Sequence, residues 1–186
     1  MDHMPHARRW LGAILLLIIG LPVGCAKPPI VAPNRPEPVP AREWMYQESG
    51  AHINEAGPVF YGIGMAAGVR NTTLLRAAAD NEARTEMGRI LRAYINALGT
   101  EAGLDSEVNG DAQLLGTLSR NALQRARIVD HWRDDSDGNF KALCHLELAQ
   151  LKKLIEAEFQ LNPAQRAKML QMADTVHQRM TARRGP

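Results

Sequence analysis

The density of proline residues decides where a folded domain can begin in this chain of 186 residues. Six of the fourteen residues from Lys27 to Pro40 are proline. Proline lacks a backbone N–H and has a nearly constant φ, so this segment favours extended polyproline II over helix or central strand. At about 3.1 Å per residue, it would hold a domain roughly 40–50 Å from whatever precedes it. We therefore predict a tether over residues 25–43 and a folded domain that begins near Trp44. A docking site for a proline-binding protein is the alternative function of the same segment.

The residues in front of the tether have the order of a bacterial lipoprotein signal. A basic start, Arg8 and Arg9, precedes an apolar segment from Leu11 to Val23. This segment of about 13 residues is shorter than the roughly 20 that a membrane-spanning helix needs. A small residue and a cysteine then follow, Gly24 and Cys25. We predict a signal peptide over 1–24, cleavage between these two residues, and a palmitate-type lipid on the cysteine.

One position departs from the usual lipoprotein pattern. Pro22 stands where such signals usually carry an aliphatic residue, so the prediction depends on Leu21, Val23 and the cysteine together with the tether. An uncleaved N-terminal anchor and a cleaved signal without lipid remain as alternatives. Two or more acyl chains anchor a protein stably where one does not. Because Ala26 rather than aspartate follows the cysteine, we expect the outer membrane, with the domain facing the periplasm.

Charge and cysteine content narrow the classes of function. The formal net charge is +2, and without Arg8, Arg9 and Asp2 the chain has 20 basic and 19 acidic residues. Aromatic residues make up 5% of the chain. We therefore expect no nucleic-acid partner, which would need a basic face or a stacking platform. The only cysteines are Cys25 and Cys144, so lipidation of the first excludes a disulfide framework.

Apolar periodicity downstream of Trp44 predicts a small α+β domain. The run Val59–Met65 is typical of a strand, and Asn71-Thr72-Thr73 is a group of good N-cap residues before a helix that reaches Leu98, with Gly99 as its C′ glycine. The apolar stripe of this helix consists of Leu75, Ala79, Ala83, Met87, Ile90, Leu91, Tyr94, Ile95 and Leu98. On its polar side, Arg76, Asp80 and Arg84 are spaced for i,i+4 pairing.

The second half of the domain returns to strands and then to helices. After a polar loop over 100–110, the pattern predicts a helix over 112–123 and a hairpin of strands 126–132 and 140–148, joined by an Asp-Gly turn. The face of the second strand toward the core would carry Phe140, Ala142, Cys144, Leu146 and Leu148.

Two helices are predicted to close the chain. One runs over 148–161, with Phe159 in its apolar stripe, and Pro163 is placed as the first residue of the next. We expect a single domain over 44–161, followed by an amphipathic C-terminal helix and a basic tail over 162–186. A helix packed on its own domain and a helix that binds a partner are both open for this last segment.

Two segments match ligand-binding motifs only superficially. Residues 62–67 match the G-x-G-x-x-[GA] fingerprint, but no second parallel strand follows the helix, so we expect the glycines to allow close packing instead. Residues 134–138 suggest a calcium loop, yet that alignment places Arg133 at the first ligand position and Cys144 at the twelfth. Both positions require acidic oxygen donors, so we predict no calcium site.

The remaining reactive side chains form no catalytic pattern. His131 and His145 can lie near each other across the hairpin, but two histidines without a third ligand make a poor zinc site, and we expect both on the strand surface. Cys144 has no neighbouring base and is predicted to be a small core residue. We therefore predict no catalytic residue, no cofactor and no metal.

Several segments together resemble a known family. They are the lipoprotein signal, the proline-rich spacer, Glu43-Trp44, Tyr61-Gly62-Ile63-Gly64, the helix segment 77–84, Val129-Asp130-His131-Trp132 and Lys141-Ala142-Leu143-Cys144-His145-Leu146. This order resembles the LPP-twenty lipoproteins, small outer-membrane lipoproteins that include a flagellar assembly lipoprotein. The resemblance covers most of residues 44–159 and departs from the family at Cys144 and His145.

The resemblance implies a small domain in which a curved antiparallel sheet packs on a long helix, without enzymatic activity. Only the lipid-bearing cysteine carries over, onto Cys25. Our first hypothesis is an outer-membrane lipoprotein with a structural or assembly role in the cell envelope, as a homo-oligomer or with a flagellar or other envelope protein. The second is a periplasmic binding module that regulates a cell-wall enzyme or captures a ligand.

Overall fold

The computed structural model describes residues 43–134 and 137–182. The predicted signal peptide, the lipidation residue Cys25 and all of the tether except Glu43 lie outside the described residues. Within the described ranges, no helix combines the length and the apolar character needed to cross a bilayer.

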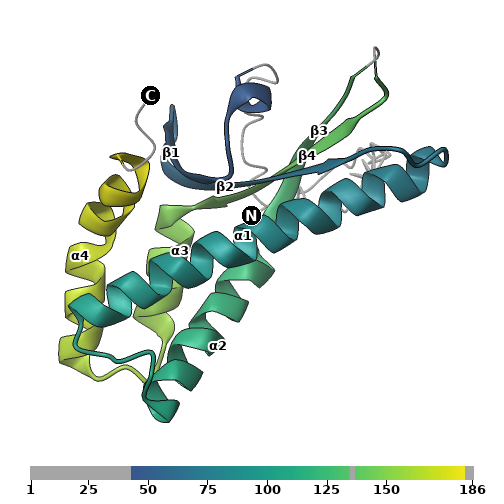
Figure 1. The fold of residues 1–186 in the computed structure, drawn as a ribbon. Coiled ribbons are helices and arrows are strands. Elements are labelled where there is room, and N and C mark those ends of the chain that lie inside the picture. The colour runs from purple at the N-terminus through teal and green to yellow at the C-terminus, as the bar shows by residue number, and fades with distance from the viewer. Residues whose placement is uncertain (1–42, 135–136, 183–186) are drawn as a thin grey trace, which may run out of the picture. The chain divides into compact units, whose positions relative to one another are not determined.

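The described residues form the predicted α+β fold, with four α-helices and one four-stranded antiparallel sheet (Figure 1). The strands are β1 (Gly50–Asn54), β2 (Gly57–Ala66), β3 (Arg127–Arg133) and β4 (Phe140–Glu147). The helices are α1 (Thr72–Glu101), α2 (Asn109–Arg125), α3 (Leu148–Ala157) and α4 (Pro163–Ala182), and a short 3-10 helix, η1 (Trp44–Tyr46), precedes β1. The strand order is β1-β2-β4-β3. The predicted hairpin is therefore confirmed, and β1 and η1 are elements that the sequence patterns did not reveal.

The helix α1 organises the domain, and its start is the predicted one. The Asn71 side chain accepts hydrogen bonds from the backbone N–H groups of Thr73 at 2.9 Å and Leu74 at 3.2 Å. These bonds satisfy two of the donors that an α-helix leaves unpaired at its N-terminus.

The end of α1 differs from the prediction. The helix continues through Gly99, and Gly103 takes the left-handed conformation at φ 75°. Leu104 N–H donates to the Gly99 carbonyl at 2.9 Å and Gly103 N–H donates to the Thr100 carbonyl at 3.1 Å, the two bonds of a Schellman cap. Gly99 is buried against Leu115 instead, where an added Cβ would lie 2.7 Å from a methyl carbon. The close packing of α1 against Leu115 therefore explains why residue 99 is a glycine.

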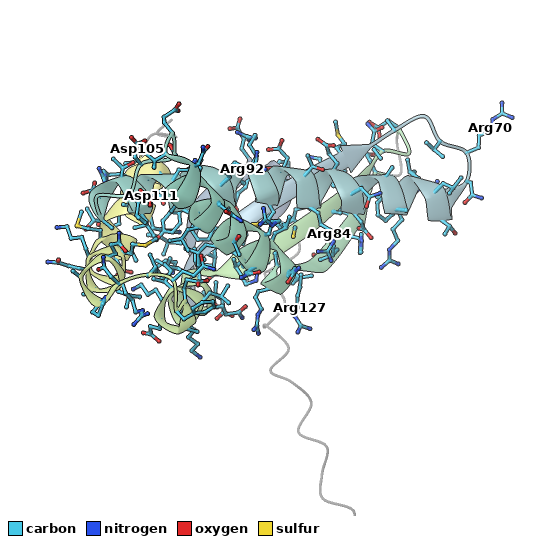
Figure 2. All side chains as sticks on the ribbon, turned by 90° about the horizontal axis from the view of Figure 1, so that it is seen from below. Arg70, Arg84, Arg92, Asp105, Asp111 and Arg127 are labelled. Carbon is cyan, nitrogen blue, oxygen red and sulfur yellow. The ribbon has the colours of Figure 1, made fainter. Side chains whose placement is uncertain are left out.

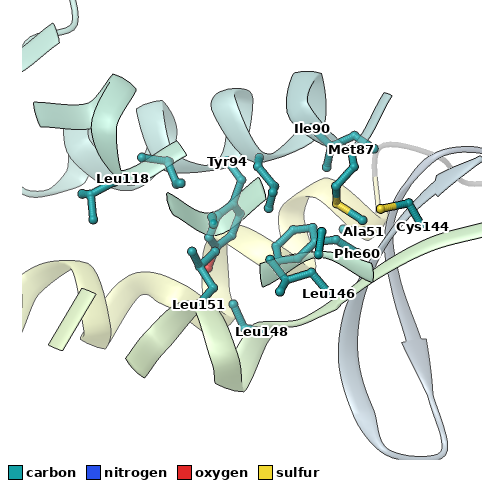
Figure 3. Packing of buried hydrophobic residues seen from close by; sticks show 14 of the residues in the cluster. Ala51, Phe60, Met87, Ile90, Tyr94, Leu118, Cys144, Leu146, Leu148 and Leu151 are labelled. Carbon is teal, nitrogen blue, oxygen red and sulfur yellow. The ribbon is translucent and has the colours of Figure 1, made fainter. Parts of the chain in front are cut away.

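The main core lies between α1 and the sheet, as Figure 3 shows. The predicted apolar stripe of α1 is buried throughout, and so is the predicted core face of β4. Leu148, Leu151, Met169 and Val176 bring α3 and α4 into the same cluster. The buried Tyr94 hydroxyl donates to the Ala173 carbonyl at 2.8 Å and so joins α1 to α4. The C-terminal helix therefore packs on its own domain.

Close contact between β2 and α1 depends on Gly62 and Gly64, as the sequence predicted. A Cβ on Gly62 would lie 2.3 Å from the Ala83 carbonyl oxygen, and one on Gly64 would lie 2.2 Å from the Ala79 carbonyl oxygen. The glycines of the superficial nucleotide motif thus serve strand-to-helix packing within an antiparallel sheet.

The connection between α3 and α4 corrects the predicted helix over 148–161. α3 ends at Ala157, and Phe159 is 85% exposed although the sequence pattern placed it in an apolar stripe. The Arg166 guanidinium donates to the carbonyls of Glu158 and Leu161 and so supports the extended turn. Pro163 is the first residue of α4, as predicted.

Candidate functional site

The predicted site residues lie outside the described residues, whereas the reactive side chains for which the sequence predicted no catalytic role are described. The predicted site residues are Gly24 and Cys25. Cys144 is fully buried among core side chains, and burial raises the pKa of its thiol to about 11. Because the reactive form of cysteine is the thiolate, a buried thiol with a raised pKa is a packing residue, as predicted.

The two hairpin histidines lie on opposite faces of the sheet. A β-bulge between Ile128 and Asp130 inserts Val129, and this extra residue reverses which face the following side chains occupy. His131 consequently points toward α1, where its Nε2 lies 2.6 Å from Oδ1 of Asp80. His145 lies on the other face, where its ring is tilted against that of Tyr61 with the ring centroids 5.8 Å apart.

These placements correct two predictions about charged and titratable side chains. His145 was expected on the surface but is 6% exposed, and burial lowers the pKa of its imidazole. Asp80 was expected to pair with arginines of its own helix, whereas it contacts His131. Within residues 43–134 and 137–182, no group of three or more His, Cys, Asp or Glu side chains has an arrangement that could hold a metal ion.

The face of the sheet opposite α1 is partly covered by η1. Trp44 is buried against Val59, Tyr61 and Leu143, and its indole N–H donates to Asp130 at 2.9 Å. The Lys141 ammonium donates to the Met45 carbonyl at 2.9 Å. The first residues after the predicted tether are thereby attached to the sheet by an apolar side chain and two polar contacts.

A cavity of about 390 Å³ lies beside η1, near the end of the β3–β4 hairpin. It is lined by Met45, Tyr46, Met65, Trp132, Asp134, Asp137, Asn139 and Lys141. Its walls mix apolar, basic and acidic side chains, so they do not favour one class of ligand.

A second open surface lies between α1 and α2, and we call it the arginine groove. Two adjoining cavities of about 520 and 360 Å³ form it and share Gly88, Arg92, Asn96 and Leu123. The other lining residues are Arg84, Thr85, Arg89 and Ala93 on α1, and Ser106, Ala112, Gly116, Ser119 and Arg120 on or next to α2. Figure 2 shows Arg92 on α1 next to α2, with Arg84 farther along the same helix.

The charge of the arginine groove has a single sign. Its lining contains four arginines and no aspartate or glutamate. Arg89 is paired with Glu86, one turn back on the same helix, at 2.6 Å. The Arg84 guanidinium donates to the Ala126 carbonyl at 3.4 Å, which holds it at the end of α2 without neutralising it. Arg92 and Arg120 are exposed, so their guanidinium groups are accessible to an anionic ligand.

The floor of the arginine groove is apolar in the larger cavity and mixed in the smaller one, where Ser106 and Ser119 add polar groups, and it contains two helix glycines. Leu123, Ala93 and the hydrocarbon parts of the arginines form most of the lining of the larger cavity. A Cβ on Gly88 would lie 3.4 Å from a methyl carbon of Leu123, and one on Gly116 would lie 3.6 Å from the end of the Arg120 side chain. Both are ordinary contacts, so close packing of the helices does not require glycine at either position.

No family model, curated protein or solved structure matches the chain. The geometry of the described residues is therefore the structural basis for a functional assignment. The sequence did contain one sign of the arginine groove, since Gly88 and Gly116 interrupt two patterns that otherwise favour helix. What the sequence could not show is that the two glycines face the same space.

Proposed function

We propose that this protein is a lipid-anchored outer-membrane lipoprotein with a non-enzymatic structural or assembly role in the cell envelope. The observation that carries the proposal is the order of basic start, short apolar segment, Gly24-Cys25 and proline-rich tether. The resemblance to the LPP-twenty family supports it and makes a flagellum-associated role the specific form of the hypothesis. In this proposal the domain faces the periplasm, and the tether lets it bind its partners away from the membrane surface.

The arrangement of the domain is compatible with this role. The reactive side chains of the described core take part in packing or pairing: Cys144 in the apolar cluster, His177 on the Val59 carbonyl and His131 on Asp80. Open surfaces of the described residues include the arginine groove and the cavity beside η1. Surfaces of this kind suit binding and assembly.

The lipid can be tested by metabolic labelling of the full chain with a palmitate analogue. We expect label on the wild-type protein and none on Cys25→Ala. Cys144→Ala is the matched control, because it removes the other cysteine and should leave the label in place. An unlabelled wild-type protein, or label that persists in Cys25→Ala, would refute lipid attachment at this residue.

The alternative is a periplasmic binding module that captures a ligand or regulates a cell-wall enzyme. The arginine groove favours it, since a one-signed, apolar-floored groove is suited to a complementary partner. Light scattering on the chain from residue 41 onward separates the two roles. A structural oligomer should give a mass of several chains, whereas a binding module should remain a monomer.

A further inference from the structure

We propose that the arginine groove binds an acidic amphipathic helix of a partner protein. The inference rests on the binding role proposed above and adds the chemistry of the partner. Helix-in-groove recognition needs an apolar channel of suitable length and charged borders that select the partner. The described residues provide both features.

The length and shape of the groove suit a helix. The lining residues on α1 run from Arg84 to Asn96, which at 1.5 Å per residue corresponds to about 18 Å, or roughly three helical turns. A rod can enter a concave channel along its whole length. A flat bilayer surface would touch only the rims, so the shape favours a helix over a membrane.

The charge selects an acidic partner. Guanidinium groups form planar, bidentate hydrogen bonds with carboxylates, and Arg92 and Arg120 stand exposed on the two helices that border the groove. Glutamates on both sides of a narrow apolar stripe would meet these two borders at once. A neutral or basic helix would leave the arginines without compensation in a partly desolvated channel.

The undescribed segments that adjoin the domain at its two ends lack the required charge. Residues 26–42 contain Lys27, Arg35 and Arg42 but one acidic residue, Glu37, and the C-terminal end adds Arg183 and Arg184. These segments would be repelled by the arginine groove. The occupant is therefore expected to come from another protein.

The two glycines give an independent reason to regard the groove as a binding surface. Glycine inside a helix is less stable than alanine by about 0.5–1 kcal/mol, and neither Gly88 nor Gly116 is needed for packing. What their missing side chains do provide is depth in the channel. A partner with alanine or leucine on its apolar stripe would fill that depth.

The experiment measures fluorescence anisotropy of a labelled peptide titrated with the full chain in detergent. The probe has about sixteen residues of alanine, leucine and glutamate, arranged so that glutamates flank a leucine stripe when the peptide is helical. A scrambled peptide of the same composition has the same charge without the stripe. Dihexanoyl phosphatidylglycerol serves as the anionic lipid competitor.

Two pairs of variants separate the arginine groove from the rest of the surface. Gly116→Leu fills the channel without changing charge, and Gly110→Leu, on the same helix with no atom near its Cβ position, is its control. Arg92→Gln removes a border charge, and Arg76→Gln, an exposed arginine of the same helix outside the groove, is its control. We expect Gly116→Leu and Arg92→Gln each to weaken peptide binding by at least about tenfold, with both controls near wild type. Circular dichroism of each variant checks that it is folded.

Several results would overturn the proposal. One is that the amphipathic peptide does not bind, and another is that the scrambled peptide binds equally well. The proposal also fails if both groove variants bind the peptide with wild-type affinity, or if the anionic lipid displaces the bound peptide. The labelling of Cys25 is measured independently. Loss of peptide binding with intact labelling would therefore refute the partner chemistry and leave the lipoprotein assignment standing.

Discussion

Glycines have opposite roles at the two interfaces of helix α1, one with the sheet and one with α2. On the side toward the sheet, Gly62 and Gly64 of β2 lie so close to the α1 backbone that a single added carbon would collide with it. On the side toward α2, Gly88 and Gly116 leave a Cβ at ordinary contact distance and border an open channel. The first pair closes an interface, and the second pair keeps one open.

The difference shows that a glycine must be interpreted by what surrounds it. Loss of backbone freedom on folding makes glycine unfavourable in both elements. At β2 the close approach of strand and helix offsets that cost. At the arginine groove, no packing contact among the described residues offsets the cost of glycine. A bound partner would supply a contact that does.

The largest expected effect tests the closed side. Gly64→Ala would place a Cβ 2.2 Å from two backbone atoms of α1, the Ala79 oxygen and the Ala83 nitrogen, so strand and helix must separate. We expect the free energy of unfolding to fall by about 3 kcal/mol or more, at the upper end of overpacking effects. Chemical denaturation monitored by circular dichroism measures the change. A loss below about 1 kcal/mol would show that this interface is not closed.

The next largest effect is the loss of stability at low pH, and it concerns buried histidines of the sheet and its packed helices. His145 and His177 are both buried, and burial lowers the pKa of each imidazole below 6.5. The Nε2–H of His177 donates to the Val59 carbonyl at 2.9 Å, and its Nδ1 has no partner among the described residues. A proton added at Nδ1 would therefore be a buried charge without a hydrogen-bond partner, and the attraction of the Asp174 carboxylate does not outweigh the cost of burial.

The sign of the pH effect follows from proton binding. Both imidazoles have a lower pKa in the folded chain than in the unfolded chain, so below about pH 6.5 the unfolded state binds more protons. The free energy of unfolding should be constant above that pH and fall as the pH drops. Denaturation curves between pH 8 and pH 5 measure this fall, and His177→Gln should make it shallower. An unchanged slope in the variant would contradict the role of this imidazole.

The smallest expected effect tests the arginine groove, and it is an increase in the free energy of unfolding. Gly116→Ala adds a methyl group that meets no close atom, and it removes backbone freedom from the unfolded chain. We expect the free energy of unfolding to rise by about 0.5–1 kcal/mol. Thermal denaturation measures it, with the exposed substitution Arg76→Gln as a surface control. Destabilisation by Gly116→Ala would mean that this glycine is required for packing, which would remove one support of the arginine groove proposal.

Much of the fold was predictable from local patterns. The Asn71 cap, the strand around Tyr61, the hairpin over β3 and β4, and Pro163 at the start of α4 all follow from turn chemistry and apolar periodicity. β1 escaped prediction because its five residues contain two small ones, Gly50 and Ala51, and little periodicity. Phe159 was misplaced because periodicity does not show where a helix stops.

The candidate site was predictable to a smaller extent. Lipidation at Cys25 stays a prediction, and it needed only the sequence because a signal and a tether are linear features. The contacts of His131 and His145 were not accessible, because the bulge at Val129 reverses the alternation of faces. The arginine groove lies between two consecutive helices, α1 and α2, and a local pattern does not show which of their faces meet or what space they leave open.

The sequence by itself determined most of the helices and strands, and it alone supports the predicted signal and tether, because these features depend on residues that are neighbours along the chain. Tertiary structure decided what each glycine does. Gly62, Gly64 and Gly99 are enclosed by other elements, while Gly88 and Gly116 border open space. Glycine has no side chain, so the hydrophobic pattern of the sequence does not show what it contacts. Its role depends on which atoms the rest of the fold places next to it.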